Sequence, residues 1–102
     1  MNSVVKDVAQ LMTDNLVNSA IIIQQNYPIG IVTDTDFRSK VATGRISLTA
    51  TIDKLMASPV LCVNESVSVA EAQLLLLKYN VSHLCVTVDG SDKSDVKGVV
   101  SE

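Results

Sequence analysis

Aromatic residues are nearly absent from this chain of 102 residues, which has no tryptophan, one phenylalanine and two tyrosines. Because 47% of its residues are hydrophobic, we expect one compact domain with an aliphatic core. Basic residues are also few: eight Lys and Arg against eleven Asp and Glu give a formal net charge of −3. Nucleic-acid-binding proteins usually present a basic face with stacking aromatics, so the composition argues against a nucleic-acid partner.

Long apolar runs are missing as well. No stretch approaches the length of a membrane span, and no charged segment followed by an apolar one marks a secretory signal. The sequence therefore predicts a cytoplasmic protein without a membrane partner. Cys62 and Cys85 lie in apolar runs without a Cys-x-x-Cys motif, and the chain has one histidine. We predict two reduced, buried cysteines rather than a zinc site.

An internal repeat is the most informative feature that the sequence does contain. The segment 30–36 (Gly-Ile-Val-Thr-Asp-Thr-Asp) returns in part as 98–102 (Gly-Val-Val-Ser-Glu), and 5–12 aligns with 69–76. Extra residues of the second copy fall in a polar loop at 89–95, as expected of an inserted turn. Two copies of one small unit commonly pack together, so we expect a ligand between them.

Periodicity and capping signals predict a mixed α/β chain. Six apolar residues at helical spacing predict a helix over residues 4–16: Val4, Val5, Val8, Leu11, Met12 and Leu16. Further predicted elements are a strand at 20–23 buried on both faces, a turn at 24–28, a strand at 29–32, a helix from Asp34 or Thr35 to Thr43 ended by Gly44, and a helical turn at 51–56. In the second copy we predict a strand at 59–63 starting with Pro59, a helix to Tyr79 opened by the capping-box pair Ser68 and Glu71, and strands at 84–88 and 96–100.

The ends of the two copies differ. The second copy has a strand before its capped helix, whereas the first begins with its helix. The second copy also stops where the first continues into a helix. We therefore expect a segment cut at both ends.

Two motifs resemble a known family. The stretch Pro28–Asp36 and the stretch Leu55–Val60, in this order and followed by Asn80–Leu84, resemble the cystathionine-β-synthase (CBS) domain. Two tandem copies resemble a CBS pair, or Bateman module, similar to those of bacterial signal-transduction proteins with cyclic-nucleotide-binding and nucleotidyltransferase-like domains. The resemblance implies an α/β (α+β) fold of two strand-helix-strand-strand-helix motifs, 1–44 without its first strand and 45–102 without its last helix.

The resemblance also implies a function. Such pairs are non-catalytic regulatory modules that bind an adenine nucleotide (AMP, ADP, ATP or S-adenosylmethionine) in the cleft between the motifs and signal to an attached effector domain. They commonly form homodimers through their helices, and no cofactor is implied. The positions that match ligand-contacting residues of the family are Thr33, Thr35, Asp36, Ala57, Ser58, Pro59, Val60, Val81, Ser82 and His83.

The chemistry of the first three residues suits this role. Ionised Asp36 can accept both hydroxyl hydrogens of a ribose, and Thr33 and Thr35 can donate to phosphate oxygens. Arg38 and Lys40 would add positive potential. The alternatives remain open: the carboxylates could only cap a helix, His83 could be a surface residue at a strand start, and Asp34 with Asp36 could mimic a metal pair, although no third ligand is visible.

Other functions are weighed against the sensor. A structural dimerisation module without ligand is the alternative. An enzyme is not predicted, because the sequence has no Ser/His/Asp set, no phosphate-binding loop and no Gly-x-Gly-x-x-Gly motif. A second, pseudo-symmetric site would use Asn18–Ala20 with Ser101 and Glu102, and we expect it to be incomplete.

Overall fold

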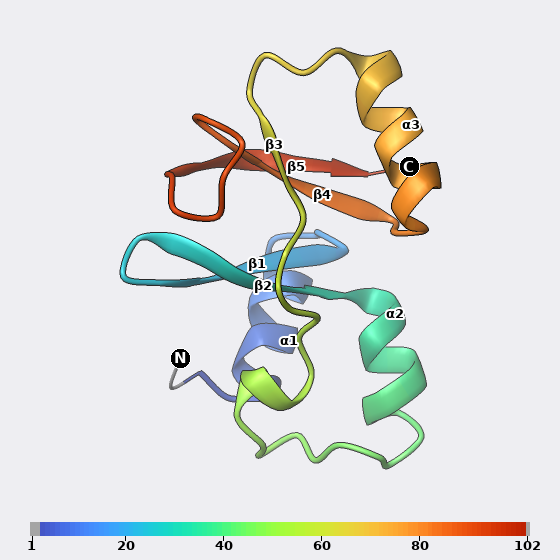
Figure 1. The fold of residues 1–102 in the computed structure, drawn as a ribbon. Helices are drawn as coiled ribbons and strands as arrows, with labels where there is room; N and C mark the ends of the chain where they lie inside the picture. The colour runs from blue at the N-terminus through green and yellow to red at the C-terminus, as the bar shows by residue number, and fades with distance from the viewer. Residues whose placement is uncertain (1–2, 102) are drawn as a thin grey trace. The chain divides into compact units, whose positions relative to one another are not determined.

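The computed structural model describes residues 3–101. The chain divides into two compact units, residues up to Ile23 with Gly30–Ser58, and Gln24–Ile29 with the residues from Pro59 onward. Both parts of the chain contain helices and strands, in blue to green for the first part and yellow to red for the second (Figure 1). The predicted mixed α/β class is confirmed.

Helix α1 (Val5–Asp14) buries a single stripe. Val5, Val8 and Met12 are buried, which agrees with the predicted helical spacing. The stripe is narrower than predicted, since Val4 is only partly buried, Leu11 is 59% exposed and Leu16 is 92% exposed. Leu11 lies on the flank of the buried stripe, and Leu16 follows the helix in a left-handed backbone conformation (φ 54°).

The start of α1 is satisfied by the backbone of a later segment. Val4 is the N-cap and has no side-chain acceptor to offer the free N–H groups of the first turn. Instead, the N–H of Val5 donates to the carbonyl of Ala50 at 2.8 Å, and the N–H of Lys6 donates to that of Leu48 at 2.9 Å. The segment 48–50 thus does for this helix what a capping side chain does elsewhere.

Strands β1 (Ser19–Gln24) and β2 (Tyr27–Thr33) form a two-stranded hairpin. Gln25 and Asn26 both have positive φ, as a two-residue hairpin turn of type I′ requires. The prediction that the first strand is buried on both faces is wrong. No residue of β1 is fully buried and Ile23 is 49% exposed, because a two-stranded sheet covers little of its own surface.

The helix predicted from Asp34 or Thr35 to Thr43 is present but has an unusual geometry. A short α-helix, α2 (Asp34–Asp36), widens into a π-helical turn, η1 (Phe37–Val41), in which the N–H of Ala42 donates to the carbonyl of Phe37 at 2.8 Å. Gly44 follows with φ of +83°, so the predicted helix end is confirmed. The helical turn predicted at 51–56 is the 3₁₀-helix η2 (Ile52–Lys54).

The first unit has its own aliphatic core. Six buried residues form it: Val5, Val8, Met12, Val32, Ile52 and Leu55. Two of them follow residue 44, so the segment 45–58 contributes to this core. The predicted motif boundary between 44 and 45 concerns the sequence repeat and stays a prediction.

The second unit is a three-stranded sheet covered by one helix. β4 (His83–Thr87) lies between β3 (Cys62–Asn64), to which it runs parallel, and β5 (Val96–Ser101), to which it runs antiparallel. The strand predicted at 59–63 is therefore misplaced, and Pro59 does not begin it. β3 begins later than predicted because its hydrogen bonds to β4 begin at Leu61, whose carbonyl accepts from the N–H of Cys85.

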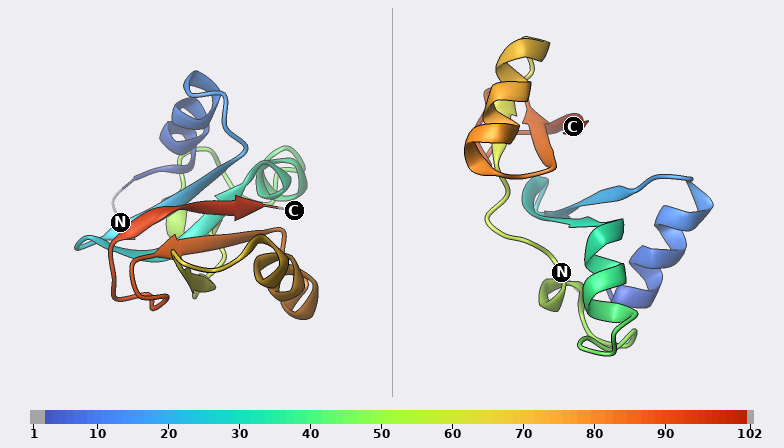
Figure 2. Two further views of the ribbon diagram at one scale, coloured as in Figure 1. Left: turned by 90° about the horizontal axis from the view of Figure 1, so that it is seen from above. Right: turned by 90° about the vertical axis from the view of Figure 1, so that its right-hand side faces the viewer.

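Helix α3 (Val69–Tyr79) packs against this sheet (Figure 2). Ser68 caps it by accepting from the N–H of Glu71 at 3.1 Å, as predicted. Its far end is closed by Asn80 in a left-handed conformation. The core between helix and sheet consists of Val63, Ala72, Leu76 and Leu84.

Candidate functional site

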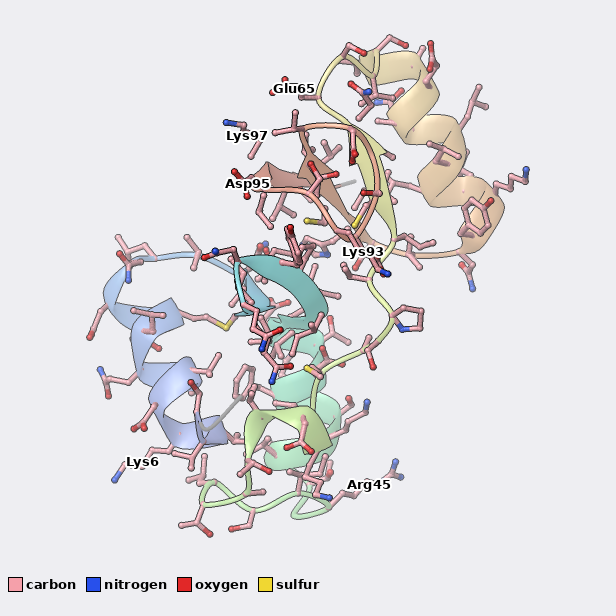
Figure 3. All side chains as sticks on the ribbon, turned by 60° about the vertical axis from the view of Figure 1, so that its left-hand side comes forward. Lys6, Arg45, Glu65, Lys93, Asp95 and Lys97 are labelled. Carbon is pink, nitrogen blue, oxygen red and sulfur yellow. The ribbon has the colours of Figure 1, made fainter. Side chains whose placement is uncertain are left out.

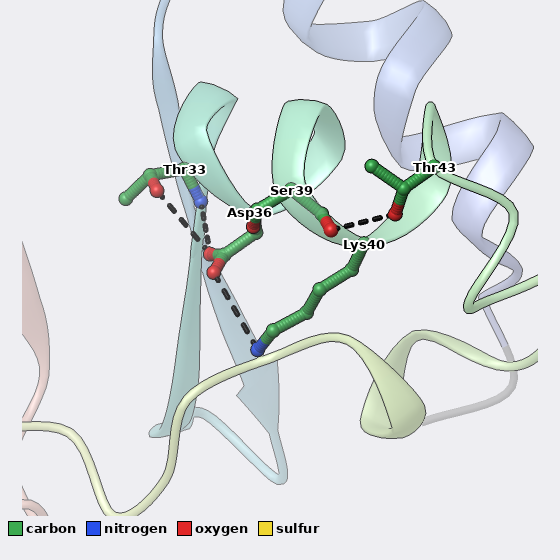
Figure 4. Close-up of polar contacts among 5 residues, drawn as sticks. All are labelled: Thr33, Asp36, Ser39, Lys40 and Thr43. Carbon is green, nitrogen blue, oxygen red and sulfur yellow. Dashed lines mark hydrogen bonds and ion pairs between the residues drawn. The ribbon is translucent and has the colours of Figure 1, made fainter.

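Asp36 occupies the third position of α2 and reaches back to the residue that caps it (Figure 4). Its Oδ2 accepts from the N–H of Thr33 at 2.9 Å and from the Thr33 hydroxyl at 3.2 Å. This is the reach-back bond of a capping box. The capping role left open by the sequence is therefore present, and it holds the carboxylate in one orientation at the end of β2.

The same carboxylate has its other oxygen beside a cation. Lys40 Nζ lies 3.8 Å from Asp36 Oδ1, one helical turn further along, and both side chains are partly exposed. An exposed pair of this kind contributes little to stability. A carboxylate oxygen has two acceptor positions, so Oδ1 keeps capacity for a hydroxyl group of a ligand.

The two threonines differ in what they can still donate. The single hydroxyl proton of Thr33 is used in the bond to Asp36. Thr35 accepts instead, from Arg38 Nη2 at 3.3 Å, so its own hydroxyl proton is free for an acceptor such as a phosphate oxygen. Both threonines were predicted to donate. Within residues 3–101, Thr33 gives its proton to Asp36, whereas Thr35, with the guanidinium of Arg38 beside it, retains a free donor.

The segment with Ala57 and Ser58 lies beside β2. The N–H of Ile31 donates to the carbonyl of Ala57 at 3.0 Å, and the N–H of Ala57 donates back to Ile31 at 2.9 Å. Gly30 permits this approach, since a Cβ there would lie 2.5 Å from Met56 Sδ and 3.1 Å from the Ala57 carbonyl oxygen. The structure thus joins Ala57 to the strand that carries Thr33.

The second unit places three predicted residues at the start of β4. The N–H of Val81 donates to the carbonyl of Leu76 at 3.1 Å, which ties this turn to α3. Ser82 Oγ and His83 Nδ1 are 2.7 Å apart and share a hydrogen bond. His83 Nε2 is buried and has no hydrogen-bond partner among residues 3–101.

The ten predicted residues therefore fall into one set in each unit. Pro59 is exposed and Val60 is buried, and both belong to the second unit with Val81, Ser82 and His83. That both sets hold one ligand stays a prediction. For the second predicted site, Ser101 pairs with His83 across β4 and β5, while Glu102 lies outside the described residues.

Two backbone contacts of the first set were not foreseen. The N–H of Asp34 donates to the carbonyl of Asn18 at 2.9 Å, so the residue before β1 helps to place α2, although the sequence pointed to Asn18 only for the second site. The Ile31–Ala57 bridge was also missed. The side-chain contact between Arg38 and Thr35 was not foreseen either. Their spacing (i, i+3 on a helix) could have indicated it, because residues three apart lie next to each other on a helix.

Other charged side chains are Lys6 on α1, Arg45 on the loop after η1, and Lys93 and Asp95 on the loop before β5 (Figure 3). Within residues 3–101, no three His, Cys, Asp or Glu side chains come together to hold a metal ion. In the same range, every helix is too short or too polar to cross a bilayer.

Known proteins similar to this chain include two curated relatives. A meiotically up-regulated protein of Schizosaccharomyces pombe is 29% identical over 109 residues, covering 99% of this chain and 15% of its own length. An uncharacterised protein of Methanocaldococcus jannaschii is 32% identical over 74 residues, covering 72% of this chain and 17% of its own. The chain thus spans about a sixth of the length of these relatives.

Solved structures share the fold. A signal-transduction protein with CBS domains from Burkholderia ambifaria superposes with a TM-score of 0.80 at 27% identity, covering 98% of this chain and 71% of that one. The CBS domain pair of MJ0100, in complex with 5′-methylthioadenosine and S-adenosyl-L-methionine, gives 0.81 at 24% identity over 98% and 76%. A CBS domain protein of Pyrobaculum aerophilum complexed with AMP gives 0.80 at 23% identity over 98% and 75%. Residues 2–43 and 52–102 each match the CBS domain, and the chain therefore belongs to the CBS-domain family as a tandem pair.

Proposed function

We propose that this chain is a non-catalytic regulatory module that binds an adenine nucleotide and passes the binding event to an effector domain of its parent protein. The observation that carries the proposal is the Asp36 carboxylate, fixed by two bonds from Thr33 and keeping an accepting oxygen. A carboxylate held in advance loses little conformational freedom on binding a ribose hydroxyl. Two structures of the same fold contain AMP, or 5′-methylthioadenosine with S-adenosylmethionine, which supports an adenosine ligand.

The phosphate end of the ligand is assigned from the donors that remain free. Thr35 has an unused hydroxyl proton, and Arg38 lies beside it. Lys40 adds a second positive charge near the carboxylate. This grouping favours a ligand that carries phosphate on its ribose, and we rank AMP, ADP and ATP above S-adenosylmethionine. Ala57 to Val60 and Val81 to His83 stay predicted contacts.

Calorimetric titration of the chain with AMP, ADP, ATP and S-adenosylmethionine tests the proposal. We expect Asp36→Ala to weaken the affinity by roughly 1.5–3 kcal/mol, as for a lost hydrogen bond to a charged group. Because this change also removes a cap, Ser68→Ala serves as the control: it removes the cap of α3 and should leave the affinity unchanged. No heat with any of the four ligands would reject the nucleotide sensor.

A second candidate is a structural dimerisation module that needs no ligand. The specific observation in its favour is the outer surface of α3, where Leu74 is 66% exposed and Leu77 is 79% exposed. Apolar side chains grouped on an exposed helix commonly mark an interaction surface. Sedimentation of the chain without nucleotide shows whether it associates. The calorimetric titration separates the two candidates, since this one requires association without binding of any of the four ligands.

A further inference from the structure

The two cysteines of the chain lie opposite each other on neighbouring strands. Cys62 opens β3, Cys85 is the middle residue of β4, and the two are register partners in the parallel ladder. The bond from the N–H of Cys85 to the carbonyl of Leu61, at 2.9 Å, fixes this register. Paired residues of adjacent strands point to the same face of a sheet, so both thiols lie on one side.

This placement is compatible with a covalent bond between them. Neighbouring strands are about 4.7–4.9 Å apart, inside the Cα separation of about 4.4–6.8 Å that disulfides span. Both cysteines are free, and the Cys62 thiol donates to the carbonyl of Val60, two residues before it, at 3.8 Å. The sequence predicted two reduced, buried cysteines. In the structure Cys85 is buried, Cys62 is only partly buried, and the two are register partners.

The pair lies on the face of the sheet that is turned away from the core under α3. The residues that pack under α3, among them Val63 and Leu84, belong to the opposite face of the sheet. Cys85 is fully buried, while Cys62 is only partly buried. An oxidant from solution would therefore meet Cys62 first, and Cys85 would be the neighbouring thiol that responds.

We propose that Cys62 and Cys85 form a redox modification site, which takes a hydroperoxide as its oxidant and closes into a disulfide between β3 and β4. The Cys62 sulfur attacks the peroxide, so that an S–O bond forms, the O–O bond breaks and the thiol proton leaves on the departing oxygen as an alcohol or water. The Cys85 sulfur then attacks the Cys62 sulfenic acid, so that the S–S bond forms, the S–O bond breaks, and the Cys85 thiol proton leaves with the hydroxyl group as water. Two thiols are oxidised by two electrons, the hydroperoxide is reduced, and a thiol reductant reverses the bond.

The bond would act on a short ladder. β3 is joined to β4 by only three register pairs, and it directly follows the segment with Pro59 and Val60. A covalent link at its first pair would hold the beginning of β3 in place. Reversible disulfides in reducing compartments are typically redox-sensing ones.

The test is oxidation of the whole chain with hydrogen peroxide, followed by counting of free thiols in denaturant. We expect the count to fall from two to zero and to return to two after reduction. Tryptic digestion without reduction should give one linked species that joins peptides 55–78 and 79–93, with a mass lower by two hydrogens than the sum of the two peptides.

A matched variant tests whether the disulfide forms because the two cysteines are register partners or only because both belong to neighbouring strands. The double change Cys62→Val with Val63→Cys keeps two thiols but moves one to the other face of the sheet, where its register partner is Val86. This variant should retain two free thiols under the same treatment, or form links between chains only. A count that stays at two in the unaltered chain, Cys62 oxidised with Cys85 still free, or an equal internal link in the variant would each overturn the proposal.

Discussion

At the scale of single residues, a donor that is already bonded within the fold cannot also serve a ligand. Thr33 and Thr35 have the same side chain and lie two positions apart, yet one gives its proton to Asp36 and the other receives a bond from Arg38. Their chemical roles toward a ligand are therefore different. The sequence shows two equal threonines, and only the local hydrogen bonds distinguish them.

Glycine positions give a sharp prediction at this scale. Gly30→Ala would place a methyl group against Met56 and the Ala57 carbonyl oxygen, with distances of 2.5 Å and 3.1 Å before relaxation. We expect a loss of about 1–3 kcal/mol in the free energy of unfolding, as for overpacked sites. Urea unfolding followed by circular dichroism measures it.

Gly98 is the control for this change, since it holds the matching place in the second copy. Among the described residues, nothing lies within 4 Å of a Cβ added there. Gly98→Ala should be neutral or should stabilise by up to about 1 kcal/mol, because alanine restricts the unfolded chain. Equal losses at both glycines would show that strand backbone, rather than the Ile31–Ala57 bridge, demands glycine.

At the scale of elements, α3 has two apolar faces, of which one is buried and the other is exposed. Ala72 and Leu76 are buried in the core of the second unit, whereas Leu74 and Leu77 face outward. The low contrast between the faces was visible in the sequence as an unbroken run of four leucines. The run alone could not say which leucines are buried.

If the chain associates through α3, the change Leu74→Glu with Leu77→Glu should weaken the dimer at least about tenfold, since it places charge in an apolar contact. Folding should persist, because both side chains are already exposed. Gln73→Glu, an exposed neighbour on the same helix, is the matched control for added charge. Sedimentation equilibrium over a range of concentrations gives the dissociation constants. An unaltered constant in the double variant would assign association to another surface.

Much of the fold could be predicted from local signals. Ser68 and Glu71 predicted the start of α3, Gly44 predicted a helix end, and the order of elements followed from periodicity. The π-helical widening at Phe37–Val41 could not be predicted, because such turns are rare and no residue type in the segment signals one. The delayed start of β3 depends on pairing with β4, a contact between residues distant in sequence.

The candidate site could be predicted about as far as the fold. Asp36 and the two threonines follow from the motif, and the same residues also indicated the alternative that the carboxylates cap a helix. The bridge from Ala57 to Ile31 and the bond from Asp34 to Asn18 join backbone groups. Backbone groups are the same in every residue, so no side-chain pattern indicates such partners.

At the scale of the whole molecule, one thiol links folding to pH. Burial raises the pKa of Cys85 from 9.0 to about 12. The unfolded chain therefore loses this proton at a lower pH than the folded chain does. The stabilisation is fully present below pH 9 and is lost as the pH rises toward 12.

We expect the free energy of unfolding to fall above pH 9, with a contribution of up to about 1.4 kcal/mol per pH unit from this group. Urea unfolding between pH 8 and 10.5, under reducing conditions, measures the slope. Cys85→Ala should be less stable overall but should show a shallower slope. Parallel slopes in the two proteins would mean that Cys85 ionises as readily in the folded chain as in the unfolded one.

The backbone bonds between the start of α1 and the segment 48–52 have a practical consequence. Ser3, Val5 and Lys6 are each hydrogen-bonded to that segment, so the segment after the exposed bend at Gly44 and Arg45 is anchored independently of the bend itself. A foreign sequence inserted at this bend would leave the hydrogen bonds between the start of α1 and the segment 48–52 intact. The bend is accordingly a natural attachment point for a reporter or an added domain.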